Sequence, residues 1–270
     1  MPRRNSHVWK GTSILAATIS LLGGMLLVRN HFLEPVRDAK THCLPERQEG
    51  QTVVFIDKTD LWNDHGAGRL VGHVLRLVQE RMRDEELLRI YIFGEKISHG
   101  FETAFTACKP PLTVPSNIID SEAFRRRKFD EVFGGPLRKV MEEAKKPEEG
   151  LCSPIAEVTV EVLTRVEVKH WAGPTRLVYF SDMAQNTQIY SAFRSTRCYP
   201  VNAQRDHTSD GRPLIQHFER HRSMMNLANT SAIIFQVIPE KNPPHVRDTS
   251  KAKWSDVFRI LSINAEWELL

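Results

Sequence analysis

Polar residues that could do chemistry occur in three short segments of the sequence: residues 57–60 (DKTD), 152–154 (CSP) and 181–182 (SD). The first and third directly follow β-branched and apolar runs that are typical of buried strands, and the second precedes a helix-like stretch. In an open parallel sheet, ligands bind beyond the carboxyl ends of the strands. We therefore expect these segments to meet at one end of a sheet.

Four oxygen-bearing side chains in these segments form the predicted metal site. Asp57 and Asp182 supply carboxylates, and Thr59 and Ser153 supply hydroxyls. An all-oxygen set suits a hard divalent cation such as Mg²⁺, Mn²⁺ or Ca²⁺. Because so few of these ligands are charged, coordination positions remain for water or for a partner's carboxylate, which favours an adhesion site over a catalytic one.

At these residues the sequence resembles the von Willebrand factor A (vWA) family, over residues 51–270 in element order. That family forms a metal-ion-dependent adhesion site from an Asp-x-Ser-x-Ser turn after the first strand, a Thr in a later loop and an Asp after a central strand. The resemblance implies that Asp57 and Thr59 occupy the first two turn positions, Ser153 the loop position and Asp182 the last position. It also implies a protein-binding rather than an enzymatic role.

The turn departs from the family pattern at its third position, where Leu61 cannot ligate a metal. Either the site is weak, or Asp60 or Asp64 compensates, or the fold has kept its shape and lost the ion. Capping and turn formation at strand ends are the alternative roles for Asp57 and Asp182.

An enzymatic alternative starts from the same segment. Residues 55–59 (FIDKT) also resemble the nucleophile strand of haloacid-dehalogenase-like phosphatases, which implies Asp57 as nucleophile and Asp182 as a Mg²⁺ ligand. However, no carboxylate stands two residues after Asp57 to act as acid and base. The sequence also lacks a Gly-rich phosphate loop and a nucleophile elbow. We therefore predict that the protein is not an enzyme, with a phosphatase as the alternative.

Strands and helices that could position these segments alternate along residues 51–270. Strands are predicted at 52–56, 88–93, 176–181 and 231–238, with an edge strand within 101–108. Helices are predicted over 70–82, 121–145, from Pro154 with Ser153 as N-cap, over 214–227, and from Trp254 onward. This alternation predicts a three-layer α/β fold, in which helices cover both faces of a mostly parallel sheet.

Residues 12–28 (TSILAATISLLGGMLLV) form an uncharged apolar run of a length that just crosses a bilayer core. We predict a transmembrane anchor here, so that residues 1–50 comprise a cytoplasmic tip, the anchor and a spacer. A cleaved signal peptide and a buried core helix are the alternatives. Basic residues predominate before the run, which favours a cytoplasmic N-terminus and an exported domain. We predict a single-pass protein of a bacterial inner membrane, with its domain in the periplasm.

The net charge of +4 belongs entirely to the N-terminal region. Residues 1–37 contain five basic residues and one acidic residue, which leaves 32 of each for the rest of the chain. A nucleic-acid-binding domain would carry its own basic excess, so no nucleic-acid partner is expected. The predicted partner is a protein at or near the membrane, and a metal-free structural subunit of a membrane complex is a further alternative.

Four cysteines, Cys43, Cys108, Cys152 and Cys198, all follow the predicted anchor. In an oxidising compartment they permit two disulfides in any of three pairings, and ordinary buried thiols are the alternative. A zinc cage is not expected because no Cys-x-x-Cys spacing occurs.

Two further motifs are expected to be solvated helix faces. His217 and His221 stand one helical turn apart, but no third zinc ligand is evident. The basic run at residues 125–128 could touch anionic lipid or nucleic acid, but acidic residues bracket it.

Overall fold

The computed structural model describes residues 18–24, 36–45, 49–59, 64–95, 103–111, 122–146, 148, 150–193, 198, 211–238 and 244–270. The chain divides into two compact units, 1–37 and 38–270. In the first unit, residues 18–24 are helical, and Ile19, Leu21 and Leu22 are exposed. No helix in the described ranges has the length and apolarity to cross a membrane. The rest of the predicted anchor, 12–17 and 25–28, lies outside the described residues.

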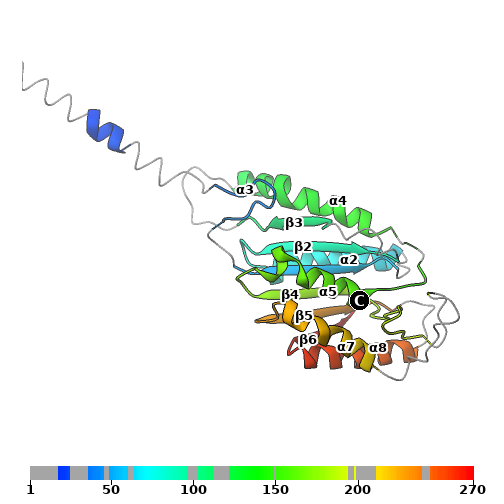
Figure 1. Cartoon of the computed structure of the whole chain (residues 1–270). Coiled ribbons are helices and arrows are strands. Elements are labelled where there is room, and N and C mark those ends of the chain that lie inside the picture. The colour runs from blue at the N-terminus through cyan, green and yellow to red at the C-terminus, as the bar shows by residue number, and fades with distance from the viewer. Residues whose placement is uncertain are drawn as a thin grey trace, which may run out of the picture. The chain divides into compact units, whose positions relative to one another are not determined.

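The second unit is built on a six-stranded sheet with the spatial order β3-β2-β1-β4-β5-β6 (Figure 1). The strands are β1 (Gln51–Asp57), β2 (Leu87–Phe93), β3 (Phe105–Cys108), β4 (Thr175–Ser181), β5 (Thr230–Gln236) and β6 (Asn264–Leu269). All neighbours are parallel except β2 and β3, which are antiparallel. The strand order reverses direction between β1 and β4, as in doubly wound α/β folds, and this is the point where such folds bind ligands.

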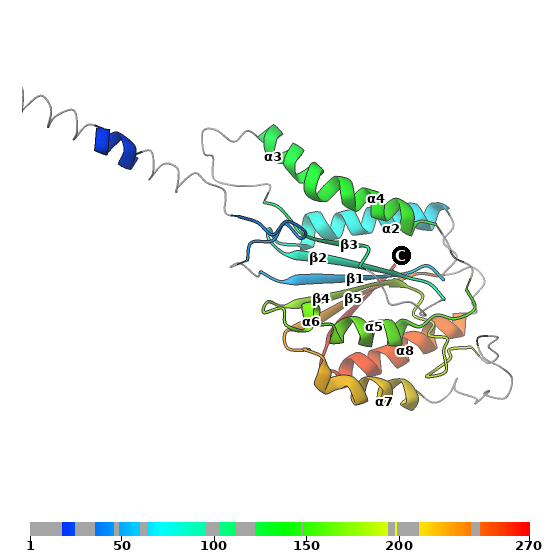
Figure 2. The same cartoon turned by 45° about the horizontal axis from the view of Figure 1, so that its top comes forward.

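Helices cover both faces of the sheet, which confirms the predicted three-layer arrangement (Figure 2). One face carries α2 (Asp64–Arg76) with η1 (Leu77–Arg81), and α3 (Glu122–Phe129), η2 (Asp130–Gly134) and α4 (Gly135–Ala144). The other carries α5 (Ile155–Thr164), α6 (Val166–Lys169), α7 (Arg212–His221) with η4 (Arg222–Met224), and α8 (Pro244–Ile260).

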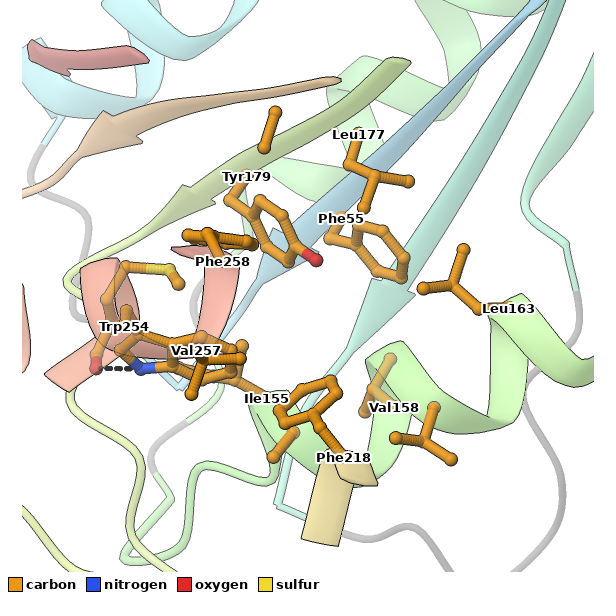
Figure 3. Packing of buried hydrophobic residues seen from close by; sticks show 14 of the residues in the cluster. Phe55, Ile155, Val158, Leu163, Leu177, Tyr179, Phe218, Trp254, Val257 and Phe258 are labelled. Carbon is orange, nitrogen blue, oxygen red and sulfur yellow. Dashed lines mark hydrogen bonds between the residues drawn. The ribbon is translucent and has the colours of Figure 1, made fainter. Parts of the chain in front are cut away.

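Alternate residues of β1 supply two separate cores because successive side chains of a strand point to opposite faces. Val54 and Ile56 belong to the core under α2 and α4, whereas Phe55 belongs to the core under α5, α7 and α8. There the ring of Phe55 stacks on Tyr179 at 4.8 Å, close to the fully buried Trp254 (Figure 3). Truncating a side chain of this size in a core typically costs about 3–5 kcal/mol.

The C-terminal prediction was wrong in part, because α8 ends at Ile260 and the chain returns to the sheet as β6. The helix ends in a Schellman motif: the amide of Ile263 donates to the carbonyl of Phe258 (2.8 Å), and that of Ser262 donates to Arg259 (3.1 Å). Ser262 adopts the left-handed conformation (φ 61°) that glycine usually supplies. No glycine or proline therefore marks the end of α8 in the sequence.

The four cysteines form two disulfides, Cys43–Cys108 and Cys152–Cys198. Cys43 and Cys108 pack with Leu87 in a small apolar cluster, at the end of the sheet where β2 begins. The alternative of buried thiols is wrong, because all four cysteines are paired.

Candidate metal site

Asp57 is the last residue of β1, and its side chain is fully buried between the ends of β2 and β4. Its Oδ1 accepts hydrogen bonds from the amide (2.9 Å) and the hydroxyl (2.6 Å) of Thr59. Its Oδ2 accepts from the hydroxyls of Ser153 (2.6 Å) and Ser181 (3.2 Å). A carboxylate offers about four lone-pair sites, and these hydrogen bonds involve both of its oxygens.

Burial raises the pKa of the Asp57 carboxyl above its ordinary value, and the hydrogen bonds from Ser153, Thr59 and Ser181 oppose that rise. The four donors are neutral groups, so they stabilise the ionised carboxylate less than a cation would. A positive charge placed beside these hydroxyls would favour the ionised form of Asp57.

The hydroxyl oxygens around Asp57 differ in the hydrogen bonds that they accept. A hydroxyl that donates its proton to a carboxylate keeps its lone pairs for another partner. The Ser181 oxygen already accepts the amide of Met183 (2.9 Å), and it therefore also fixes the chain after β4. The oxygens of Thr59 and Ser153 are suited to a hard cation, and the donor set therefore fits Mg²⁺ or Ca²⁺ chemically.

Asp182 follows Ser181 and shapes the turn beyond β4. Its Oδ1 accepts the amide of Ala184 (2.6 Å), and its carbonyl accepts the side-chain amide of Gln236 (3.2 Å). The alternative role in turn formation is thus confirmed for Asp182, and the hydrogen bond from the Thr59 amide to Oδ1 of Asp57 confirms it for Asp57 as well. Ser181, which was not among the predicted ligands, is the residue at this end of β4 whose side chain hydrogen-bonds Asp57.

The prediction that Ser153 caps the following helix was wrong. Helix α5 begins at Ile155 after Pro154, with no side-chain hydrogen bond from the capping position. Because the Ser153 hydroxyl is directed to Asp57, the amide of Ala156 is satisfied by Oε1 of Gln185 instead (2.8 Å). Gln185 comes from the loop after β4, 29 residues away in sequence, so no local signal could have revealed it.

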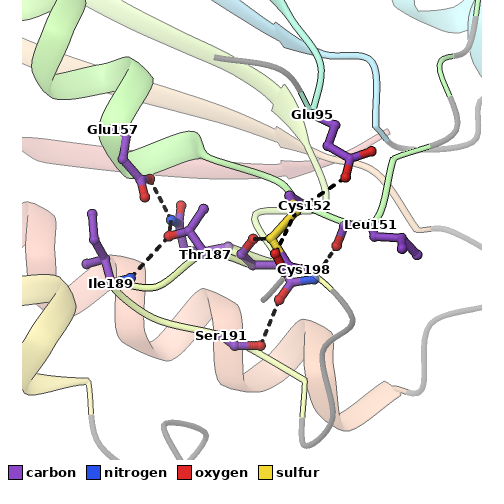
Figure 4. The surroundings of a disulfide bond; sticks show 10 residues. Glu95, Leu151, Cys152, Glu157, Thr187, Ile189, Ser191 and Cys198 are labelled. Carbon is purple, nitrogen blue, oxygen red and sulfur yellow. Dashed lines mark hydrogen bonds between the residues drawn. A yellow bond between two sulfur atoms is a disulfide. The ribbon is translucent and has the colours of Figure 1, made fainter. Parts of the chain in front are cut away.

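Gln185 also connects α5 to a buried polar network, part of which surrounds the second disulfide (Figure 4). Its Nε2 donates to Glu157 (2.7 Å) and to the hydroxyl of Thr187 (2.6 Å). Burial raises the pKa of the Glu157 carboxyl, and hydrogen bonds involving Thr187 and Gln185 counteract the rise. The loop after β4 is therefore held rigidly against the start of α5.

The segment that carries Ser153 is fixed on its other side by Asn186 and the Cys152–Cys198 disulfide. The backbones of Ser153 and Asn186 exchange hydrogen bonds of 3.2 and 2.9 Å. The Asn186 side chain donates to the carbonyl of Leu151. These contacts hold Ser153 where its hydroxyl reaches Asp57.

The side chains expected to compensate for Leu61 fall outside the part of the chain that the structure describes. Asp60 and Leu61 lie outside the described residues, and Asp64 is described only by its backbone at the start of α2. Within the described ranges, no three His, Cys, Asp or Glu side chains gather as a metal-binding group. Compensation by Asp60 or Asp64 therefore stays a prediction.

The two remaining motifs differ in exposure. The rings of His217 and His221 lie 4.9 Å apart, and burial, His221 and Arg220 lower the pKa of His217 to about 4. His217 is half-buried, so the predicted solvated face is wrong there. Helix α3, which holds the basic run, buries no residue, and its Arg126 pairs with Glu122 at 2.8 Å, as expected for a solvated face.

No protein-family model matches the chain, and no curated protein matches it either. The pilus adhesin SpaC from Lactobacillus rhamnosus GG is similar in structure, with a TM-score of 0.50 and 8% identity over 87% of this chain and 29% of that chain. The VWA domain of SpRpn10 matches with a TM-score of 0.38 and 12% identity, over 83% of this chain and 89% of that one. The human COPII-coat protein Sec24c matches with a TM-score of 0.39 and 11% identity, over 84% of this chain and 30% of that one.

These similarities extend to the fold alone. The chain spans less than a third of the SpaC and Sec24c chains. The strand order and the likeness to SpaC agree on a mostly parallel α/β fold. This fold is consistent with the vWA/Rossmann-like class.

Proposed function

We propose that residues 51–270 form a protein-interaction module that binds its partner through a divalent cation, and that residues 12–28 anchor the chain in a membrane. The observation that carries the proposal is the buried Asp57 carboxylate, which orients the hydroxyls of Thr59 and Ser153 at the carboxyl ends of β1 and β4. This is the ligand-binding position of a doubly wound sheet.

Thr59 and Ser153 would hold Mg²⁺ or Ca²⁺ through their hydroxyl oxygens, with Asp57 supplying negative charge behind them and Asp182 adding a second carboxylate. Water or a carboxylate of the protein partner would fill the other positions, since both ions take six or more oxygen ligands. A cation held by so few charges binds weakly on its own and more tightly when the partner adds a charge.

The phosphatase alternative has less support. A nucleophilic carboxylate must reach phosphorus, but the Asp57 side chain is fully buried and accepts four hydrogen bonds. Thr59 occupies the position two residues later where an acid-base carboxylate would be needed. These observations favour a binding role.

Placement in the periplasm, tethered to a bacterial inner membrane, is supported by the uncharged run at 12–28 and by the two disulfides. Disulfides of this kind persist in oxidising compartments. The equal numbers of acidic and basic residues after Arg37 favour a protein partner over nucleic acid.

The proposal is tested by thermal unfolding of the full-length protein in neutral detergent, with millimolar Mg²⁺ or Ca²⁺ compared with EDTA. Either cation should raise the melting temperature, because a ligand that binds only the folded state stabilises it. Asp57→Ala should abolish the shift. Glu86→Gln, which alters a buried carboxylate at the opposite end of the sheet, should retain it. The absence of any shift in the wild-type protein would remove the cation from the proposal.

A further inference from the structure

The two edges of the sheet are built differently. The β3 edge is four residues long, and the amide of its Cys108 donates to the carbonyl of Thr41 (2.7 Å), in a segment tied to β3 by the Cys43–Cys108 disulfide. The β6 edge is six residues long, and among the described residues its only strand partner is β5. An edge strand presents a row of backbone donors and acceptors to any strand that can pair with it.

One face of β6 is acidic. Glu266 and Glu268 alternate along the strand and share one cation, Arg81, at 3.5 and 2.9 Å. Their side chains are 62% and 36% exposed. Within the described part of the chain, these ion pairs set two carboxylates against one guanidinium, which gives this face of β6 a negative charge.

The other face of β6 is apolar. Trp267 is partly buried against the core under α8, and the ammonium of Lys251 lies 5.6 Å from the centre of its ring. Leu269, two residues further along the same face, is 66% exposed. A side chain on a neighbouring strand could therefore bury apolar surface at this position.

We propose that β6 binds an extended segment of a partner protein in which Lys or Arg alternates with apolar residues, as an additional strand of the sheet. The basic residues would lie beside Glu266 and Glu268, and the apolar residues beside Trp267 and Leu269. Backbone hydrogen bonds would supply affinity, and the alternating side chains would supply specificity.

A second copy of this chain fits the edge poorly. Antiparallel pairing of two β6 strands would bring glutamates of both copies onto neighbouring positions, and like charges across strands are destabilising. The charge of β6 thus selects a basic partner and disfavours self-association.

The β6 edge is separate from the candidate metal site. Asp57 and Ser153 lie beyond β1 and β4, whereas β6 is the far neighbour of β5. The edge proposal therefore needs no cation, and each proposal can fail while the other stands.

The experiment uses the full-length protein in neutral detergent with EDTA and a fluorescein-labelled peptide of alternating Lys and Val, and binding is followed by fluorescence anisotropy. We expect saturable binding that the Glu266→Lys/Glu268→Lys variant weakens by about tenfold or more, as loss of close charge pairs predicts. The matched control is Glu142→Lys/Glu143→Lys, which reverses two ion-paired glutamates on α4 and should leave affinity unchanged.

A second peptide separates strand pairing from simple charge attraction. N-methylation of alternate amides removes the backbone donors but keeps every charge, and we expect it to weaken binding by about tenfold or more. Equal affinity for the methylated peptide, equal affinity of the β6 variant, or no binding by the wild-type protein would each overturn the proposal.

Discussion

A buried carboxylate lies at each end of the sheet, and the two carboxylates differ in the groups that hydrogen-bond them. At the amino end, Glu86 accepts the Thr52 hydroxyl, the Arg83 amide (2.9 Å) and the Arg176 guanidinium (3.1 Å). At the carboxyl end, Asp57 accepts hydrogen bonds from three hydroxyls and one amide.

The difference indicates which carboxylate is structural. Glu86 meets a positive charge from its own chain, so a further cation would add little there. The hydroxyls and the amide that hydrogen-bond Asp57 are neutral groups, and their geometry places hydroxyl oxygens beside it. A buried negative charge held in this way is the better candidate for an external cation.

Removing either disulfide should have the largest effect on the free energy of unfolding. The response of the melting temperature to a cation should distinguish the two ends of the sheet. The bonds join residues 65 and 46 positions apart, so replacing either pair with Ala should lower the free energy of unfolding by about 4 kcal/mol. Only loss of Cys152–Cys198, which adjoins Ser153, should also reduce the cation-induced shift in melting temperature. Denaturant unfolding and thermal scans with and without Mg²⁺ measure both effects, and an undiminished shift would show that the disulfide does not support the site.

Substitution of Glu86, the carboxylate at the amino end, should have the next largest effect on the free energy of unfolding. Glu86→Gln leaves the Arg176 guanidinium beside a neutral amide, and breaking such a pair should cost about 3 kcal/mol because Glu86 is nearly fully buried. Urea unfolding in EDTA and in Mg²⁺ should give the same loss. A loss that depends on Mg²⁺ would mean that the two ends are not independent.

The pH dependence of stability should isolate Asp57. Because burial raises its pKa above the ordinary value of 3.8, the folded protein holds this proton to higher pH than the unfolded chain. In EDTA, the stability of the wild-type protein relative to Asp57→Asn should therefore be greatest below the ordinary pKa of 3.8. It should fall as pH rises through the raised pKa of the folded protein. Urea unfolding from acidic to neutral pH checks this, and a parallel pH dependence of the two proteins would refute the assignment.

Ser181→Ala should give the smallest effect, a loss of about 1 kcal/mol in the free energy of unfolding, from hydrogen bonds to Asp57 and from Met183. Since the Ser181 oxygen already has a donor, this variant should keep much of the cation response. Ser153→Ala should lose it. Thermal scans of the two variants side by side provide the comparison, and equal responses would remove the distinction between these hydroxyls.

The strands were predictable because their signals are local. The β-branched and apolar runs that became β1, β2, β4 and β5 are too short for helices and almost entirely buried, which is what a parallel sheet requires. β6 was missed because its sequence, NAEWEL, contains Ala, Glu and Leu, which favour helices, and because Ser262 hides the end of α8.

The site was predictable only in part, since its hydrogen bonds join distant segments. The three polar segments indicated where Asp57, Thr59 and Ser153 would gather. The choice between capping α5 and binding Asp57, which decides the role of Ser153, depends on Gln185 from another loop. The disulfide pairing likewise depends on the folded chain, because four cysteines allow three pairings.

Titration calorimetry of Mg²⁺ and Ca²⁺ into the full-length protein measures whether Asp57 and Ser153 form a cation site. We expect saturable binding by the wild-type protein and by Glu86→Gln, with affinity reduced by about tenfold or more in Asp57→Asn and Ser153→Ala. Absence of binding in the wild-type protein, or equal affinity in Asp57→Asn, would contradict a cation site at the carboxyl ends of β1 and β4.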